Sequence, residues 1–265
     1  MINAVPNMER NHSSDKSCRS LLRGLQVLES FTPQKQHLTL AELTKLLHAP
    51  KSTVYRVLKT LWGVNYLRYD EFNKRYSLGT KVLSLGFSVL HNMELREIAR
   101  PLMEAFSRNC NKTVNMAVLD KNEMVYIERV RVPSIRQFNI SIGSRIPVWN
   151  TAVGKAVLAN LDPDRQSQVL IGLKRSYKGE INEKTLTKEL ENVRKLGFAV
   201  NDQDYLKGIR AIGVPVFDEK GVVCGLNLVA EPEDGSIAEL RNRYGTELLQ
   251  LGRELSEALG FRAKT

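Results

Sequence analysis

Residues 39–79 read TLAELTKLLHAPKSTVYRVLKTLWGVNYLRYDEFNKRYSLG, and this stretch decides the fold of the first part of the chain. Leucines recur at helical spacing through residues 40–47, which predicts a short amphipathic helix. Thr39 before this run and Glu42 three residues later form a capping box at its N-terminus. The break HAP then leads into a second predicted helix over residues 51–62, whose first turn suits the proline.

A β-hairpin is predicted directly after the second helix. Two β-prone runs, residues 66–69 and 75–78, flank the polar turn DEFNK. A further helix is predicted before the quoted stretch, over residues 17–31, from the spacing of its apolar side chains. Helix, tight turn, helix and hairpin together form a winged helix-turn-helix, which places its second helix in the major groove of DNA.

The second predicted helix has a polar outer face suited to duplex DNA. It contains no acidic residue, and Ser52 and Thr53 lie at its N-terminus, where backbone N–H groups favour a phosphate. Tyr55 and Arg56 lie one turn further in, where base edges would be reached, and Lys59 suits a phosphate. The full set of predicted DNA contacts, including those of the hairpin, is Lys51, Ser52, Thr53, Tyr55, Arg56, Lys59, Thr60, Arg68, Lys74 and Arg75.

Basic residues are concentrated in the same part of the chain. The formal net charge is +10, and residues 1–90 hold 13 basic and 6 acidic residues, against 26 and 23 in residues 91–265. A basic unit indicates a polyanionic partner, either nucleic acid or an anionic membrane surface. We favour DNA, because the basic residues lie on a compact motif and not on a basic amphipathic helix.

The chain's composition disfavours several classes of function. Its three cysteines, Cys18, Cys110 and Cys224, are far apart, which excludes a disulfide scaffold or zinc ribbon and favours a reducing cytoplasmic location. Its four histidines are scattered, so no metal site is expected. No apolar stretch reaches the ~18 residues needed to cross a bilayer. We therefore expect no cofactor, no catalytic residue and no membrane partner.

The hydrophobic period changes at residue 113, and the rest of the chain mixes strands with helices. Glu128, Arg129 and Arg131 fall at the end of one predicted strand, where we expect surface ion pairs of little energy. The mixed pattern indicates the α+β class. Helices are predicted over 80–90, 93–110, 151–161, 163–170, 185–196 and 236–259, and strands over 113–119, 123–130, 137–142, 209–217 and 222–229.

Two sets of motifs are similar to those of one known family, the IclR family of bacterial transcription regulators. The first set lies in the quoted stretch and comprises LAEL (40–43), PKSTVYRVL (50–58) and RYSLG (75–79). The second set resembles the effector domain of that family and comprises GSRIP (143–147), TAVGKA (151–156), GFA (197–199), GIR (208–210) and VPVFD (214–218). The resemblance spans residues 17–260, in the family's order and spacing.

The resemblance implies a fold and an assembly. It implies an α+β chain in which an N-terminal winged helix-turn-helix is joined by a linker helix to a C-terminal GAF-like α/β effector-binding domain. The expected divisions are a disordered tail over 1–15, the DNA-binding domain over 16–79, the linker helix over 80–93 and the effector domain over 94–262. Family resemblance also implies a homodimer or a dimer of dimers, whose two-fold symmetry suits a pseudo-palindromic operator.

A pocket for a small-molecule effector is implied as well. A helix that starts near Thr151 offers N–H groups to a carboxylate, which favours a small organic acid. The family often has Asp at the position of Asn201 and Cys at that of Ala211, and Asn227 and Val229 replace its serine-rich strand. We expect an aromatic or other bulky carboxylic acid, with a sugar acid as the competing choice. The implied contacts are Ile135, Phe138, Ile146, Trp149, Thr151, Ala152, Val153, Asn201, Ile209, Ala211, Asn227 and Val229.

Taken together, the residues and the resemblance predict a DNA-binding transcription regulator, with repression favoured over activation and catabolic genes as targets. The main alternative is a small-molecule sensor that acts through protein partners, for which Arg56 would be dispensable. An enzyme built on the effector domain would need an activated nucleophile or a metal site, and the sequence contains no pattern for either.

Overall fold

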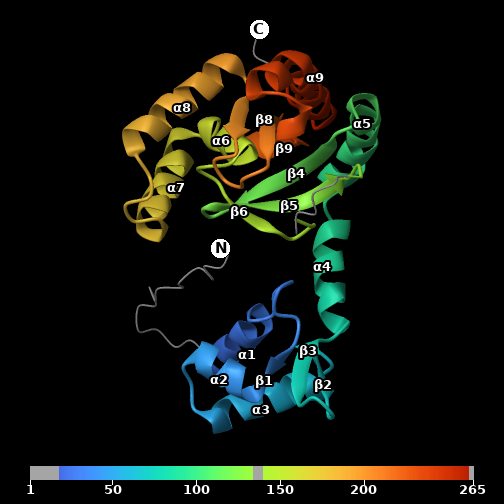
Figure 1. Ribbon diagram of the computed structural model, residues 1–265, viewed down its shortest axis with the longest axis vertical. Coiled ribbons are helices and arrows are strands. Elements are labelled where there is room, and N and C mark those ends of the chain that lie inside the picture. Colours follow the sequence, from blue (N-terminus) through green and yellow to red (C-terminus); the bar gives the residue numbers. More distant parts are fainter. Residues whose placement is uncertain (1–17, 134–139, 263–265) are drawn as a thin grey trace. The chain divides into compact units, whose positions relative to one another are not determined.

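The computed structural model of the protein describes residues 18–133 and 140–262 (Figure 1). These residues form two compact units, one that ends at Asn92 and one that begins at Met93. The predicted tail and the predicted pocket residues Ile135 and Phe138 lie outside the described residues.

The first unit is a helix-turn-helix followed by a hairpin, as the sequence predicts. Its small antiparallel sheet has the strand order β1-β3-β2. Val27, Leu43 and Leu58 are fully buried at its centre. The elements are α1 (Arg19–Glu29), β1 (Leu38–Thr39), α2 (Leu40–Leu47), α3 (Lys51–Gly63), β2 (Leu67–Asp70), β3 (Arg75–Leu78) and α4 (Lys81–His91).

Local capping sets where the two central helices begin. The Glu42 backbone N–H donates to Thr39 Oγ1 at 3.2 Å, and the Thr39 N–H donates to the Glu42 carboxylate at 2.7 Å, which confirms the capping box. His48 ends α2 in the left-handed region, with φ 46°. Pro50 occupies the N-cap position of α3, so only three residues separate the two helices, which pack against each other.

The second unit is an antiparallel sheet of six strands in the order β6-β5-β4-β9-β8-β7, with helices on both faces (Figure 1). Its core gathers buried aliphatic side chains between the sheet and α6, α7 and α8. The elements are α5 (Glu94–Cys110), β4 (Thr113–Asp120), β5 (Glu123–Val130), β6 (Arg145–Pro147), α6 (Ala152–Ala159), α7 (Pro163–Ser176), α8 (Glu183–Leu196), β7 (Ala199–Asp202), β8 (Arg210–Asp218), β9 (Gly221–Ala230), the 3₁₀ helix η1 (Pro232–Asp234) and α9 (Ile237–Ala258).

Glycines let α6 lie directly on the sheet. A Cβ added to Gly213 would be 2.4 Å from the carbonyl carbon of Ala152, and one added to Gly225 would be 2.8 Å from a methyl group of Val153. The opposite face of β8 is covered by α9, whose Gly252 lies against Val214. Helix α6 is therefore a central buried element, with the sheet beneath it and α8 against it.

The structure of the second unit differs from the sequence predictions in three places. Of the strand predicted over 137–142, the described residues 140–142 form none, and the next strand in the described part of the chain is the short β6, at Arg145–Pro147. Strand β7 was not predicted, because its four residues include two polar ones and give no clear alternation. Glu128 is not a surface residue: it is 2% exposed, and its carboxylate accepts a hydrogen bond of 2.7 Å from Arg96 Nη2.

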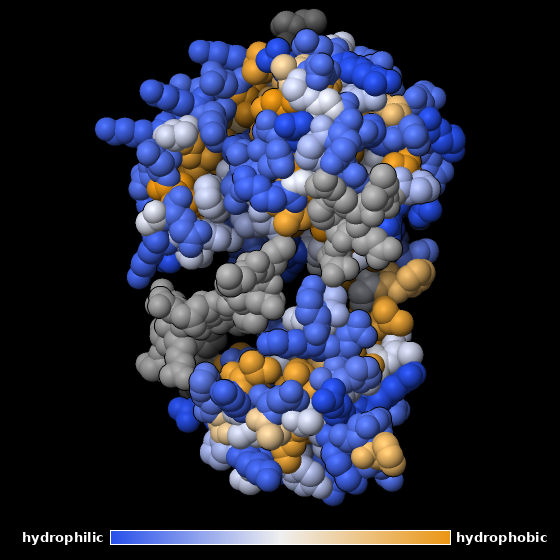
Figure 2. Space-filling model, in the orientation of Figure 1, coloured by the Kyte–Doolittle hydropathy of each residue, from blue (hydrophilic) through white to orange (hydrophobic). Residues whose placement is uncertain are grey.

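Helix α4 has no buried residue in the single chain. Leu83, Leu85, Phe87 and Val89 are 55–71% exposed. Figure 2 shows apolar side chains along the stretch that α4 occupies in Figure 1. Exposed apolar side chains gathered on one short helix usually mark an interaction surface. No helix among residues 18–133 and 140–262 has the length and apolar character of a membrane span.

Candidate functional site

The outer face of α3 carries the side chains predicted to contact DNA. Val54 and Leu58 point into the core, which turns Tyr55, Arg56 and Lys59 outward, and Tyr55 is 49% exposed. Of the ten predicted contacts, Thr53 is half-buried and the other nine are exposed. The Thr60 hydroxyl donates to the Arg56 carbonyl at 2.9 Å, so it is engaged within its own helix. The result is an exposed face with three basic residues, Lys51, Arg56 and Lys59, and no acidic residue.

The tip of the hairpin is held in one conformation by Asp70. Its carboxylate accepts hydrogen bonds from the Asn73 side chain at 2.6 Å and from the N–H groups of Phe72 and Asn73 at 2.9 and 3.1 Å. These bonds, the one from Asn73 foremost, hold the pKa of Asp70 below its usual value. Lys74 follows in the left-handed region, and both Lys74 and Arg75 are exposed on this wing.

Sequence reasoning missed a further basic region in the first unit. An open groove between the segment 33–38 and α2 is lined by Lys35, Lys45 and Arg75, with Glu42 as its one acidic residue. Lys35 and Lys45 lie outside α3 and the hairpin, so a search limited to the recognition helix and the wing could not find them. Their charge extends the basic surface beyond the predicted set.

In the second unit, the N-terminus of α6 is fixed against the sheet by its own cap. Thr151 Oγ1 accepts from the Gly154 N–H at 3.3 Å and donates to the Pro147 carbonyl at 2.7 Å. A Cβ at Gly154 would be 2.2 Å from the Val148 carbonyl oxygen, so only glycine fits there. The first residues of α6, Ala152 and Val153, lie directly over Gly213 of β8.

A row of polar side chains crosses the sheet beside the α6 N-terminus. Strand register places Gly213, Asn227, Asn115 and Arg129 opposite one another on β8, β9, β4 and β5. Asn115 Nδ2 donates to Asn227 Oδ1 at 3.2 Å, and these side chains are 1% and 4% exposed. Tyr126 lies on the same sheet, and burial raises the pKa of its hydroxyl to about 12.

Arg129 is a half-buried cation on this row. Its Nη1 donates to the Ile140 carbonyl at 2.7 Å, while its buried Nε has no partner. Among the residues that the structure describes, no carboxylate pairs with it. Burial, and then the nearby charge of Arg131, lower the pKa of the Arg129 guanidinium. An anion at this point would therefore relieve an uncompensated charge.

A second row contains three more of the predicted pocket residues. Asn201, Ala211 and Val229 are register partners on β7, β8 and β9. The Asn201 amide is used within the protein, because Nδ2 donates to the Asn150 carbonyl at 2.6 Å and reaches Asp204 at 3.4 Å. Asn201 therefore holds the segment that leads into α6 against β7.

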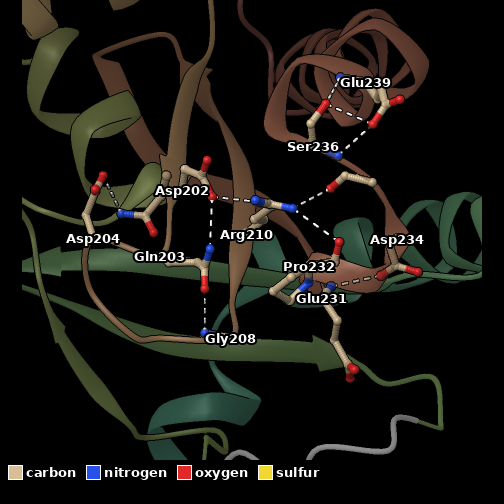
Figure 3. A network of polar contacts seen from close by, with 12 residues as sticks. Asp202, Gln203, Asp204, Gly208, Arg210, Glu231, Pro232, Asp234, Ser236 and Glu239 are labelled. Carbon is tan, nitrogen blue, oxygen red and sulfur yellow. Dashed lines mark hydrogen bonds and ion pairs between the residues drawn. The ribbon is translucent and has the colours of Figure 1, made fainter.

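The loop between β7 and β8 is fixed by Arg210 (Figure 3). Its Nε donates to Asp202 at 2.7 Å, and its Nη1 donates to the carbonyls of Pro232 and Gly235 at 3.2 and 2.7 Å. The hydrogen bond from Arg210 holds the pKa of the Asp202 carboxyl below its usual value. This network ties the loop to η1 and to the start of α9, so the edge of the sheet is rigid at this end.

The predicted pocket residues are mostly buried around α6. Trp149 and Val229 are half-buried, and the buried ones are Ile146, Thr151, Ala152, Val153, Asn201, Ile209, Ala211 and Asn227. Sequence reasoning missed Asn115 and Tyr126, and it assigned Arg129 to the surface. A usable signal was Asn115 itself, a lone amide inside the apolar strand TVNMAVL. Over the described chain, no three His, Cys, Asp or Glu side chains gather as metal ligands would.

Comparison with known proteins shows that both units match models of the same protein family. Residues 20–71 match the family model "IclR helix-turn-helix domain", and residues 87–257 match "Bacterial transcriptional regulator IclR C-terminal". The chain is 32% identical to the Pca regulon regulatory protein of Pseudomonas putida, over 91% of this chain and 84% of that protein.

Solved structures agree with this grouping. The crystal structure of an IclR family transcriptional regulator from Brucella abortus covers 93% of this chain and 96% of its own, with 27% identity and a TM-score of 0.79. An IclR homologue from Microbacterium hydrocarbonoxydans, complexed with 4-hydroxybenzoate, shares the fold with a TM-score of 0.72, at 23% identity over 91% of this chain and 97% of that one.

Proposed function

The chain belongs to the IclR family of bacterial transcriptional regulators, and on this premise we propose that it is a ligand-responsive repressor. Its winged helix would bind a pseudo-palindromic operator, and its six-stranded unit would bind a small organic acid. Catabolic genes are the proposed targets, and the cytoplasm is the proposed location. Ligand binding would act by changing the relative populations of DNA-competent arrangements.

The exposed face of α3 is the observation that carries the DNA-binding half of the proposal. Arg56 and Tyr55 lie on its outer side one turn from the N-terminus, where a recognition helix reaches base edges. Ser52 and Thr53 lie at the positive end of the helix dipole, which suits phosphates. Lys59 and the wing residues Arg68, Lys74 and Arg75 would add phosphate contacts.

The ligand-binding half rests on the polar residues around α6. Buried amides at Asn115 and Asn227 and the half-buried Arg129 share one row of the sheet, and the α6 N-terminus lies over Gly213 in the same row. Such a set of convergent polar groups is typical of a ligand site. The 4-hydroxybenzoate complex of a family member supports an organic acid as the ligand class.

Replacing Lys74 by alanine is expected to weaken binding to all DNA sequences by a similar factor. The side chain lies on the rigid wing and is fully available to a phosphate. Loss of one phosphate contact should reduce the slope of log K against log salt concentration by about 1. Titration of specific and random duplexes at several salt concentrations measures this. A change confined to one base position would contradict the assignment.

Self-association is expected to cover the apolar side chains of α4. Leu83 and Phe87 are 71% and 68% exposed, which is unusual for large apolar side chains on the surface of a monomer. We propose that α4 of a second copy of the chain packs against them. Light scattering should give two or four chain masses, and Phe87→Glu should lower the mass without lowering the helix content. A monomeric wild-type chain would contradict this assembly.

Repeated selection of duplexes from a random pool, at low and high salt, tests the proposed function directly. We expect enrichment of a pseudo-palindrome, whose half-site spacing then reports the arrangement of two winged helices. Binding that remains weak, salt-sensitive and blind to sequence, with organic acids absent and present, would favour a sensor acting through protein partners. In that case Arg56→Ala would leave the regulatory response intact.

A further inference from the structure

We propose that the polar row of Asn227, Asn115 and Arg129 recognises a polyhydroxylated carboxylic acid, with Arg129 holding the carboxylate and the amides holding hydroxyl groups. The inference rests on the proposed ligand response and specifies its chemistry. It favours a sugar acid over the unsubstituted aromatic acid that the apolar wall alone suggests.

The geometry of the row suits a ligand that is charged at one end. Arg129 and Asn115 are register partners on adjacent strands, and Asn115 and Asn227 are partners on the next pair. Gly213 follows in the same row, with the α6 N-terminus over it. A ligand lying on the row would therefore meet a guanidinium at one end and the two amides beside it.

The two amides leave a hydrogen-bonding group unused. Asn227 and Asn115 are hydrogen-bonded to each other, and the Oδ1 atom of Asn115 is buried and has no partner. Whichever way the two amides are turned, one amide atom at this end remains unpaired. A hydroxyl group both donates and accepts, so it can satisfy either orientation, whereas a hydrocarbon ring can satisfy neither.

Two more unpaired groups lie in the segment that leads into α6. Trp149 Nε1 and Asn150 Oδ1 are buried without partners. This segment is held against Asn201 and ends at Thr151, beside Gly213 of the same row. Buried polar groups without partners are rare in folded proteins and costly, so each of these groups would be stabilised by a ligand rich in oxygen atoms.

Arg129 provides the anionic preference. Its guanidinium has an unpaired buried Nε and no carboxylate partner in the described residues, although it is half-buried. A guanidinium binds a carboxylate through parallel hydrogen bonds, a geometry that a neutral ligand does not offer. The neighbouring Arg131 is exposed, which makes it a matched control on the same segment.

Four probe molecules, titrated into the full-length protein, separate the contribution of the ligand's carboxylate to binding from that of its hydroxyl groups. D-gluconate carries a carboxylate and hydroxyl groups, hexanoate the carboxylate alone, sorbitol the hydroxyl groups alone, and benzoate a carboxylate on a bare ring. By calorimetric titration we expect gluconate, one of its epimers or a shorter aldonate to bind at least about tenfold more tightly than the other three. Equal or tighter binding of benzoate, or no binding of any aldonate, overturns the proposal.

Substitutions then show which side chain binds the carboxylate and which binds the hydroxyl groups. Asn115→Leu should weaken aldonate binding by about tenfold and leave weak hexanoate binding unchanged. Arg129→Met should weaken both, whereas Arg131→Met should weaken neither. Arg129→Met should also not lower the melting temperature of the ligand-free protein, because it removes an uncompensated buried charge. A lowered melting temperature with unchanged aldonate binding would make Arg129 a purely structural residue and overturn its assignment.

The same measurements distinguish failure of this inference from failure of the proposed function. Ligand titration needs no DNA, so aldonate binding by a protein that selects no duplex would retain the ligand assignment and reject the repressor. Release of a selected operator by benzoate, with no response to any aldonate, would retain the repressor and reject the ligand assignment.

Discussion

Gly213→Ala is expected to destabilise the second unit by at least about 3 kcal/mol, because no side chain fits between β8 and α6. The added Cβ would lie 2.4 Å from the Ala152 carbonyl carbon and 2.6 Å from the Val153 backbone nitrogen. Both neighbours are backbone atoms, so no rotamer change relieves the contact, and α6 must move away from the sheet. Chemical denaturation measures the loss.

A matched control lies in α9 of the same unit. Gly245 is also buried, but a Cβ there would meet its nearest neighbour at 3.7 Å, an ordinary contact. Gly245→Ala should therefore be neutral or slightly stabilising, because alanine favours the helix over glycine by about 1 kcal/mol. Equal stability of the two variants would mean that α6 does not rest on Gly213 as described.

Displacement of α6 should also impair ligand binding. The polar row of Asn227, Asn115 and Arg129 begins beside Gly213, and the α6 N-terminus closes its end. We expect folded Gly213→Ala protein, studied below its melting temperature, to lose affinity for the ligand while its winged helix still binds DNA. That combination would separate the two units functionally.

Arg56→Ala is expected to weaken operator binding by about 1–3 kcal/mol and to relax the preference at one base position in each half-site. Arg56 is exposed on the acid-free face of α3, with Val54 and Leu58 holding that face outward. Quantitative binding to the selected operator and to its single-base variants measures both effects. Arg108→Ala, an exposed arginine of α5, is the matched control and should change neither.

Arg56→Lys decides between a base contact and a phosphate contact. A lysine keeps the charge but cannot reproduce the two parallel hydrogen bonds of a guanidinium to one base. If Arg56 reads a base, lysine should restore little of the lost discrimination. Full restoration by lysine, with a salt dependence equal to that of the wild type, would assign Arg56 to the phosphate backbone.

Local sequence signals predicted the first unit well. The bounds of α2 follow from Thr39, Glu42 and the leucine spacing, and the observed helix is Leu40–Leu47, as expected. Caps and amphipathic spacing depend on residues within a few positions of one another, so they can be read directly from the chain. The same signals predicted β4, β5, β8 and β9 to within one residue at each end.

Contacts between distant segments could not be read in this way. Glu128 lies near the end of β5 in a charged run, and only the packing of α5 on β5 shows that it is buried beside Arg96. The sequences of the short β6 and β7 show no clear alternation of apolar and polar residues. They are strands because β5 and β8 pair with them.

By itself, the sequence determined the winged helix-turn-helix, the exposed basic face of α3 and the family, because each depends on short-range spacing and residue type. Only the tertiary structure decided that Asn115, Arg129 and Asn227 share one row beside α6. Strand register brings these residues together across roughly a hundred positions of sequence, and a slip of one residue would turn each side chain to the opposite face of the sheet.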